Sequence, residues 1–286
     1  MYVIKIGGGA AIGPEAFGRF AADLAELSAD GQRCVVVHGG NAEFNRLSEA
    51  LGMPPRMVTS ASGRISRYTD RATMDAMLMA YRGKVNATLV GIFQAAGVNA
   101  VGLCGLDGAI ASGRRKAVLR GTEDGRAKVL RDDHSGTIDR VDTRLLTLLI
   151  DAGYLPVLTP PILGEGGVPI NVDGDKLALA LARDLGAEGL LFFSDTPGLL
   201  ADVCDEGSLV REIDASDPAA ALAAASGRMV VKVETAVQAI EGGVRRVIFA
   251  DGRAEAPIRG ALAGEGTVIR AGAATVPVPR LVSREG

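Results

Sequence analysis

Short apolar runs alternate along this chain with longer segments in which apolar residues recur every three or four positions. Tyr2–Ile6 has the length and apolar content of a buried strand, and the segment from Pro14 to about Ala29 has helical periodicity with proline at its start. The same two patterns follow in Cys34–His38 and Ala42–Leu51. Regular alternation of strand and helix predicts an α/β fold with a mainly parallel sheet.

The alternation continues to about residue 270. Further helices are expected at Thr73–Ala96, Val141–Ala152, Asp175–Leu185, Arg228–Glu241 and Pro257–Leu262. Further strands are expected at Val98–Leu103, Leu155–Thr159, Val168–Asn171, Leu190–Ser194, Arg245–Ala250 and Thr267–Ile269, with a hairpin made of Lys116–Arg120 and Ala127–Leu130. Pro160 and Pro161 are expected to end the strand before them. Helices on both faces predict a three-layer αβα sandwich, with lobes at 1–165 and 166–270 and a tail at 271–286.

The composition is that of a globular protein that binds small molecules. Apolar residues make up 48% of the 286 residues, and the net charge of −3 gives no reason to expect nucleic acid. The three cysteines form no C-x-x-C pair, which argues against a zinc site or a disulfide framework and fits a reducing compartment. We find no signal peptide and no membrane span in the sequence, so a cytoplasmic location is expected.

Two predicted strands end in glycine-rich turns, Gly7–Gly9 and Gly39-Gly40. Glycine lets backbone N–H groups approach a ligand closely, and Lys5 beside the first turn favours an anion such as a polyphosphate. The standard phosphate motifs do not fit, because Pro14 stands where a Walker A lysine belongs and Ile12 breaks a G-x-G-x-x-G fingerprint. Glycine alone favours the alternative, plain turns that only join strand to helix.

Two further segments carry charges next to apolar helices. Asn171–Asp175 places carboxylates at the start of a helix, where Asp commonly acts as a cap. Gly227–Lys232 places a lysine among valines, where its ammonium group either has a partner or extends to water. His38 ends an apolar strand, and we expect it to be structural rather than catalytic.

Taken in order, five elements resemble the motifs of the amino acid kinase family. They are K-x-G-G at Lys5–Gly8, H-G-G at His38–Gly40, R-x-T-D at Arg67–Asp70, N-x-N-x-D at Asn171–Asp175 with Asp173 in place of the second Asn, and the late lysine at Lys232. The resemblance extends to about Ile269 and is greatest to the acetylglutamate kinase branch.

The resemblance implies transfer of the γ-phosphoryl group of ATP, with Mg²⁺, to a side-chain carboxylate, giving an acyl phosphate. Lys5 would stabilise the transferring group, Lys232 the phosphates on the leaving side, and Asp175 would orient both ammonium groups. The implied substrate contacts are Gly39, Gly40, Arg67 and Asn171, and the implied ATP contacts are Gly7, Gly8, Gly9, Asp195, Leu200, Gly227 and Met229. No metal site made of side chains is implied.

The implied acceptor depends on finer features. Gly105-Leu106-Asp107-Gly108 departs from the Gly-Lys-Asp-Gly or Gly-Arg-Asp-Gly usual in acetylglutamate kinases. Segments 62–70, 113–116 and 154–161 resemble kinases that act on aminoadipate or glutamate attached to the amino-group carrier protein LysW, in lysine or arginine biosynthesis. The alternatives are an N-acetyl-L-glutamate kinase and a non-catalytic carrier-binding or regulatory protein on the same fold. Retention of Lys5, Asp175 and Lys232 together argues against the last.

A basic segment gives the carrier a predicted dock. Residues 110–131 hold seven Arg and Lys against Glu123 and Asp124, a net +5 in an acidic chain. Such a surface steers an acidic partner, and we assign docking to Arg114, Arg115 and Lys116; a solvated hairpin is the alternative. The chain starts at its first strand, without the extra helix found in arginine-regulated hexameric relatives, so a homodimer is expected.

Overall fold

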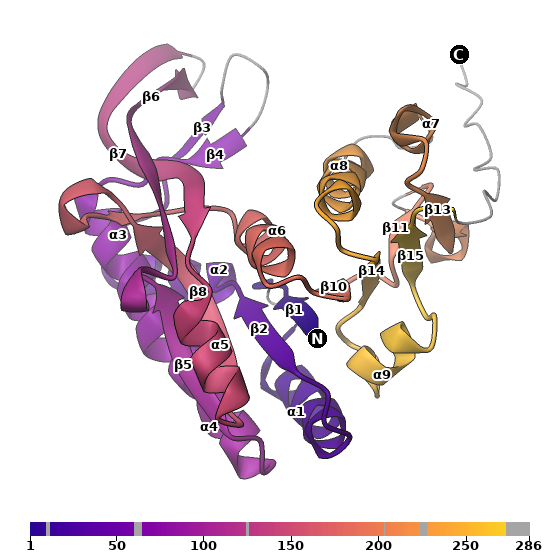
Figure 1. Cartoon of the computed structure of the whole chain (residues 1–286). Helices are drawn as coiled ribbons and strands as arrows, with labels where there is room; N and C mark the ends of the chain where they lie inside the picture. Colours follow the sequence, from indigo (N-terminus) through magenta and orange to yellow (C-terminus); the bar gives the residue numbers. More distant parts are fainter. Residues whose placement is uncertain (10–11, 60–64, 124–125, 203, 224–227, 273–286) are drawn as a thin grey trace.

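A mixed sheet of thirteen strands runs through the described part of the computed structural model, which comprises residues 1–9, 12–59, 65–123, 126–202, 204–223 and 228–272 (Figure 1). Its strands are β1 (Tyr2–Ile6), β2 (Cys34–His38), β3 (Met57–Thr59), β4 (Ile65–Arg67), β5 (Ala100–Gly105), β6 (Ala111–Glu123), β7 (Arg126–Val141), β8 (Leu155–Leu163), β9 (Pro169–Ile170), β10 (Gly189–Ser194), β13 (Glu212–Asp214), β14 (Arg246–Asp251) and β15 (Thr267–Arg270). The strands β11 (Leu199–Leu200) and β12 (Leu209–Val210) pair separately.

Helices cover both faces of this sheet. They are α1 (Pro14–Ala29), α2 (Asn41–Ala50), α3 (Arg71–Leu78), the π-helix η1 (Met79–Asn86), α4 (Ala87–Ala95), α5 (Arg144–Asp151), α6 (Gly174–Asp184), α7 (Pro218–Ala223), α8 (Arg228–Glu241) and α9 (Pro257–Leu262). The centre of the sheet, β14-β10-β1-β2-β8, is parallel, and β5 adds a further parallel pairing to β8. The predicted α/β fold with a mainly parallel sheet and helix layers on both sides is therefore confirmed. Because β10 pairs with β1, the two predicted lobes share one sheet.

The sheet separates two clusters of buried apolar side chains, because successive side chains of a strand point to opposite faces. Val3 of β1 belongs to a cluster with Leu146 of α5, Leu181 of α6 and Val233 of α8. Its neighbour Ile4 belongs to the other cluster, which α1, α4 and α9 cover. Lys5 follows Ile4 and so lies on the face of α6 and α8, at the carboxyl end of β1.

The expected boundaries need several corrections. β8 continues through Pro160 and Pro161 to Leu163, because the pairing shifts between Cys104 and Gly105 and leaves both prolines outside the hydrogen-bond ladder. The helix expected from Val141 begins at Arg144. The long helix expected at Thr73–Ala96 is present but contains η1, in which hydrogen bonds of the wider π type replace the α pattern.

The basic hairpin is far longer than the predicted strands Lys116–Arg120 and Ala127–Leu130. β6 and β7 pair from Ala111 with Val141 to Glu123 with Arg126, interrupted by register shifts at three places. β3 and β4 form a second hairpin that the sequence did not reveal, and β3 joins β6 through Thr59 and Thr122. Figure 1 shows both hairpins extending together beyond the helices that cover the sheet.

Candidate active site

Lys5 and Asp175 form an ion pair where β1 meets the start of α6. Lys5 Nζ lies 2.6 Å from Asp175 Oδ1, and the lysine side chain is only 16% exposed. Asp173 caps α6 by accepting a hydrogen bond from the Asp175 N–H at 2.8 Å. Asp173 is therefore the helix cap, whereas Asp175 faces the lysine. The sequence allowed either carboxylate to be the cap, and the structure separates their roles.

The two glycine turns touch each other through their backbones. A Cβ on Gly8 would lie 2.7 Å from Gly40 N and 2.8 Å from Gly39 C, which is closer than real Cβ atoms come. The Ala42 N–H donates to Gly8 O at 3.1 Å, which fixes the first turn of α2 against this contact. Backbone N–H groups and the N-terminus of α2 therefore meet close to Lys5, an arrangement that favours an anion.

His38 supports these turns from inside the core. Its ring is 1% exposed, with Nδ1 2.9 Å from Gly39 O and Nε2 2.9 Å from Asn86 Nδ2. Asn86 also donates to Val157 O and accepts from Arg82. The pKa of His38 is lowered to about 4, mainly by burial and to a smaller extent by the positive charges of Arg82 and Lys5, against the opposing effect of the hydrogen bond to Gly39. The predicted structural role fits this neutral, fully hydrogen-bonded ring.

Arg67 is held over α2 by neutral groups. Its Nη1 donates to Asn41 Oδ1 at 3.2 Å, its Nη2 donates to Asn45 Oδ1 at 3.1 Å, and its guanidinium carbon lies 4.2 Å from the centroid of the Phe44 ring. Tyr81 of η1 donates to the same Asn41 oxygen. Amides orient the guanidinium without neutralising it, so its charge is available to a carboxylate ligand. Sequence reasoning missed Asn41, whose position directly after Gly40 was the only signal.

Asn171 joins the same region from the end of β9. Its Nδ2 donates to Thr69 Oγ1 at 3.3 Å, and its backbone N–H donates to His134 O at 2.8 Å. The fully buried Asp133 accepts the Thr69 N–H at 3.3 Å. Asp70, which follows Thr69, caps α3. The R-x-T-D element therefore consists of an arginine aimed at α2, a threonine that contacts Asn171, and a helix cap.

Apart from Gly7–Gly9 after β1, the described residues predicted to contact the nucleotide lie on or next to β10, β11 and α8. Lys232 Nζ lies 5.7 Å from the centroid of the Phe249 ring, and Phe249 stacks on Phe192 with centroids 5.0 Å apart. Asp195 is exposed directly after β10, and Leu200 is half-buried in β11. Met229 of α8 is buried in the same core cluster as Val233, and Gly227 lies outside the described residues.

Two of the three basic residues assigned to docking already have acidic neighbours. Arg114 Nε lies 2.7 Å from Asp139 Oδ2, and Arg115 pairs with Asp132 while its Nε donates to Asp133 O at 2.8 Å. Arg115 is 27% exposed and Arg114 is 84% exposed. Lys116 is exposed. Arg115 is therefore tied to the strand that also supports Thr69, whereas Arg114 and Lys116 face solvent.

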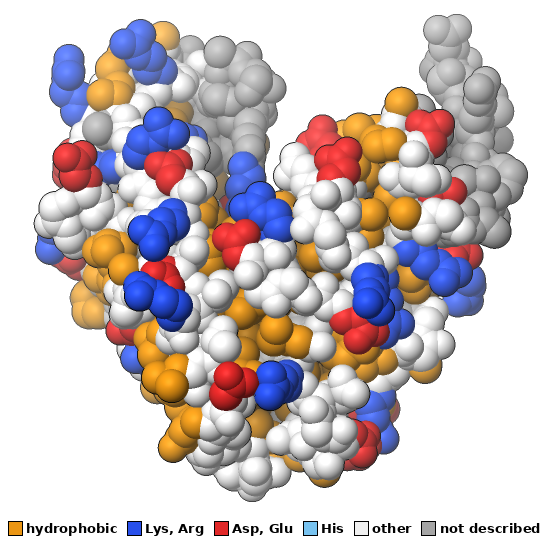
Figure 2. All heavy atoms as spheres, viewed as in Figure 1, with side chains coloured by type: hydrophobic (Ala, Val, Ile, Leu, Met, Phe, Trp, Pro, Cys, Tyr) orange, Lys and Arg blue, Asp and Glu red, His pale blue; other side chains and the backbone are white. Residues whose placement is uncertain are grey.

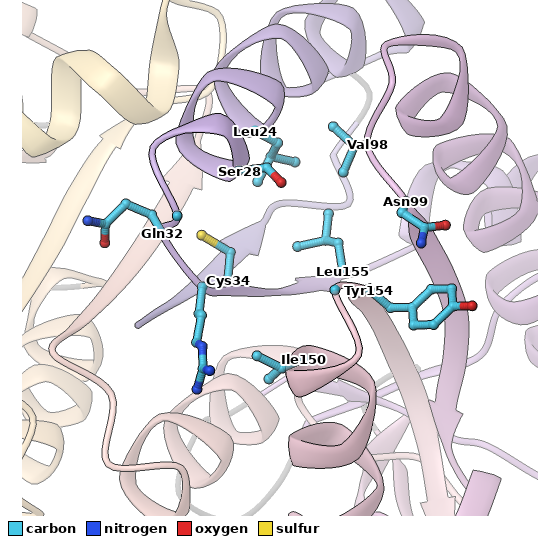
Figure 3. A pocket seen from close by; sticks show the side chains of 12 residues that line it. Leu24, Ser28, Gln32, Cys34, Val98, Asn99, Ile150, Tyr154 and Leu155 are labelled. Atoms are coloured by element: carbon cyan, nitrogen blue, oxygen red, sulfur yellow. The ribbon is translucent and has the colours of Figure 1, made fainter.

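The molecular surface is hollowed between the part that carries β6 and β7 and the part that carries α7 and α8 (Figure 2). A separate cavity of about 210 Å³ lies at the opposite end of the sheet, where Cys34 and Leu155 begin β2 and β8 (Figure 3). Since parallel sheets bind ligands at the carboxyl ends of their strands, that cavity is remote from the candidate site. Within the described ranges, no helix is long and apolar enough to cross a membrane.

Comparison with known proteins gives a consistent result. The chain is 53% identical over 269 residues to the LysW-aminoadipate kinase of Deinococcus radiodurans, covering 94% of this chain and 91% of the relative. It is 51% identical over 273 residues to the LysW-aminoadipate kinase of Thermus thermophilus, covering 94% and 100%. The acetylglutamate kinase of Methanopyrus kandleri is 35% identical over 273 residues, again covering 94% and 100%.

The fold has solved counterparts as well. N-acetylglutamate synthase from Neisseria gonorrhoeae superposes with a TM-score of 0.75 at 27% identity, over 96% of this chain and 60% of that longer chain. The model of the Amino acid kinase family matches residues 1–251, which is most of the chain. This chain belongs to the amino acid kinase family.

Proposed function

We propose that this protein phosphorylates the side-chain carboxylate of aminoadipate, or of glutamate, carried by LysW, using ATP and giving an acyl phosphate for lysine or arginine biosynthesis. The observation that carries the proposal is the Lys5–Asp175 pair beside the touching glycine turns, on the sheet face that also carries Lys232. The identity of more than half to two LysW-aminoadipate kinases supports the choice of substrate.

The chemistry needs charge stabilisation more than proton transfer. A carboxylate with a pKa of roughly 4.3 is already ionised at neutral pH, so one of its oxygens attacks the γ-phosphorus directly while the bond to ADP breaks. Lys5 and Lys232 would stabilise the charge that builds up on the phosphoryl oxygens, and Asp175 would hold Lys5 in place. His38, neutral and with both ring nitrogens occupied, is not needed as a base.

The acceptor would be oriented by the neighbouring polar groups. Arg67 has the planar fork that binds a carboxylate in two contacts, and Asn171 offers an amide to the polar backbone of the substrate. On the acceptor side Gly40 would donate its N–H group, while Gly39, whose own N–H donates to Ile6 O at 3.4 Å, would shape the turn. On the phosphate side Gly8 and Gly9 would donate N–H groups. We assign acceptor binding mainly to residues 1–165, together with Asn171, and nucleotide binding mainly to residues 166–270, together with the Gly7–Gly9 turn.

Magnesium would accompany the nucleotide. Among the described residues, no group of three or more His, Cys, Asp or Glu side chains is arranged to hold a metal. The family resemblance implies Mg²⁺ held mainly by phosphate oxygens and water, since that ion keeps several waters and uses few protein ligands. Bound there, the ion would neutralise charge on the phosphates.

A single comparison of substrates tests the proposal. The purified protein is assayed with ATP and either LysW-linked aminoadipate, LysW-linked glutamate or free N-acetylglutamate. We expect the carrier-linked acids to give the higher kcat/KM. A strong preference for free N-acetylglutamate would identify an acetylglutamate kinase instead, and turnover of none of them would favour a non-catalytic carrier-binding protein. Sedimentation of the same sample tests the expected homodimer.

A further inference from the structure

The hairpins β3–β4 and β6–β7 join into one four-stranded ribbon with two distinct faces. Residues directly opposite each other in antiparallel strands point to the same face. Thr59 pairs with both Ile65 and Thr122, and Thr122 pairs with Ala127, which defines a row across all four strands. Counting in twos along each strand places further residues on this face, which we name the outer ribbon face: Met57, Ile65, Arg67, Arg120, Val129 and Arg131.

The outer ribbon face exposes large apolar side chains. Met57 is 48% exposed, Val129 57% and Ile65 64%, whereas Val58 on the opposite face is completely buried. A sheet face in water normally carries polar residues, so three such side chains on one short ribbon indicate contact with another molecule. Arg120 and Arg131 are exposed on the same face, and each stands opposite an apolar residue on the neighbouring strand.

Arg67 shows that the outer ribbon face borders the candidate active site. Its side chain turns inward to α2, where its guanidinium contacts Asn41, Asn45 and the Phe44 ring. A molecule lying on Met57 and Ile65 therefore lies beside the arginine that we assign to the substrate carboxylate. A second copy of this chain in that place would obstruct access to Arg67, whereas a substrate-bearing polypeptide would deliver its carboxylate there.

We infer that the folded body of a protein-borne substrate docks on the outer ribbon face. Met57, Ile65 and Val129 would make apolar contacts with it, and Arg120 and Arg131 would pair with its carboxylates. This inference rests on the proposed function, and it assigns the carrier a surface separate from Arg114, Arg115 and Lys116. The apolar centre flanked by arginines matches a partner whose contact surface is apolar in its middle and acidic at its rim. Apolar contacts would supply most of the affinity, and the arginines would steer the encounter.

The test compares two substrates on one set of variants. One substrate is the complete carrier with aminoadipate, and the other is a short peptide that ends in the same modified residue and lacks a folded body. The triple variant is Met57→Gln, Ile65→Thr, Val129→Thr. Threonine at positions 65 and 129 is a residue suited to strands. Leu148→Gln, on α5, is the control because Leu148 is equally apolar and 67% exposed.

We expect the triple variant to raise KM for the complete carrier about tenfold, with kcat, KM for ATP and KM for the peptide unchanged. Arg120→Gln with Arg131→Gln should lower the salt dependence of KM for the carrier. An unchanged KM for the carrier overturns the inference, as does an equal rise for the peptide, which would place the effect in the site itself. A change of oligomeric state with an unchanged KM overturns it in favour of a second copy. Wild-type protein that does not phosphorylate the carrier refutes the proposed function before any variant is compared.

Discussion

Lys232 reaches the sheet face of Lys5 over the ring of Phe249. Lys5 is in register with Phe192 of β10, and Phe192 is in register with Phe249 of β14, so the three residues form one row across adjacent parallel strands. Two strand spacings separate the ends of this row by roughly 10 Å. The Lys232 ammonium, 5.7 Å from the Phe249 ring, therefore lies above the same row as the Lys5 ammonium. A triphosphate that extends along the row would meet both charges.

Replacing Lys232 should slow the chemical step more than it weakens nucleotide binding. Since the ammonium would act on charge that builds up in the transition state, we expect Lys232→Ala to lower kcat on the order of 100-fold with ATP still bound. Steady-state kinetics and ATP titration measure the two effects. Lys84→Ala, which removes an exposed lysine from η1, is the control and should retain full kcat. A Lys232→Ala enzyme with near-normal kcat would require another catalytic lysine.

Asp173 and Asp175 offer a matched pair with opposite expectations. Asp175→Asn removes the charge that holds Lys5, so we expect kcat to fall on the order of 100-fold with little loss of stability. Asp173→Ala removes the cap of α6, so we expect a loss of about 1 kcal/mol in the free energy of unfolding and a small effect on kcat. Urea unfolding and initial rates separate the two. Equal effects of both variants on kcat would contradict the division of roles.

The sequence predicted the elements of the site better than their support. Lys5 and the glycine turns stand out because they lie at the ends of short apolar runs, whereas the role of Asp175 is implied by the resemblance to the family's N-x-N-x-D motif. Asn41, Asn86 and Asp133 were missed because a hydrogen bond between distant segments leaves no period in the chain. The supporting role of these residues depends on the fold, which brings η1 against β2 and β7 against Thr69.

The end of β8, the full length of the basic hairpin and the hairpin of β3 and β4 were also beyond what a sequence pattern shows. β8 passes through two prolines because its pairing with β5 skips them, and pairing register cannot be read from one strand alone. The ribbon of β3, β4, β6 and β7 is rich in charged residues, so its strands lack the apolar runs that mark the central sheet. The roles of Arg114 and Arg115 differ for a similar reason, since only the fold places Asp132 and Asp139 beside them.

Gly8 should tolerate no side chain. A methyl group there would meet the backbone of Gly39 and Gly40 at less than 3.0 Å, and backbone atoms cannot move aside as a flexible side chain can. We expect Gly8→Ala to cost about 2 kcal/mol of unfolding free energy and to reduce activity at least tenfold. Gly18→Ala, in a helix with open space around the glycine, is the control and should be neutral or stabilising by roughly 0.5 kcal/mol. Thermal or urea unfolding of both variants measures the contrast.

His38 should make the protein sensitive to mild acid. Its pKa is about 4 in the folded protein because burial disfavours the charged ring, whereas the same ring in the unfolded chain titrates near its ordinary value of 6.5. Between these values the unfolded chain binds a proton that the folded protein does not, so stability falls as the pH is lowered. The contribution of the neutral ring is complete above pH 6.5 and is lost progressively down to pH 4.

The loss amounts to about 3 kcal/mol at most, from the separation of the two pKa values. Urea unfolding at pH 7, 5.5 and 4 measures it, with His38→Gln as the reference because an amide cannot titrate in this range. Carboxylates held by arginines, such as Asp142 with a pKa of about 2, lose their contribution mainly below pH 4 and affect both proteins alike. The free energy of the wild type should therefore approach or fall below that of His38→Gln as the pH drops from 7 to 4. Parallel pH profiles for the two proteins would mean that the ring carries a proton in the folded state, which its hydrogen bond to Asn86 does not permit.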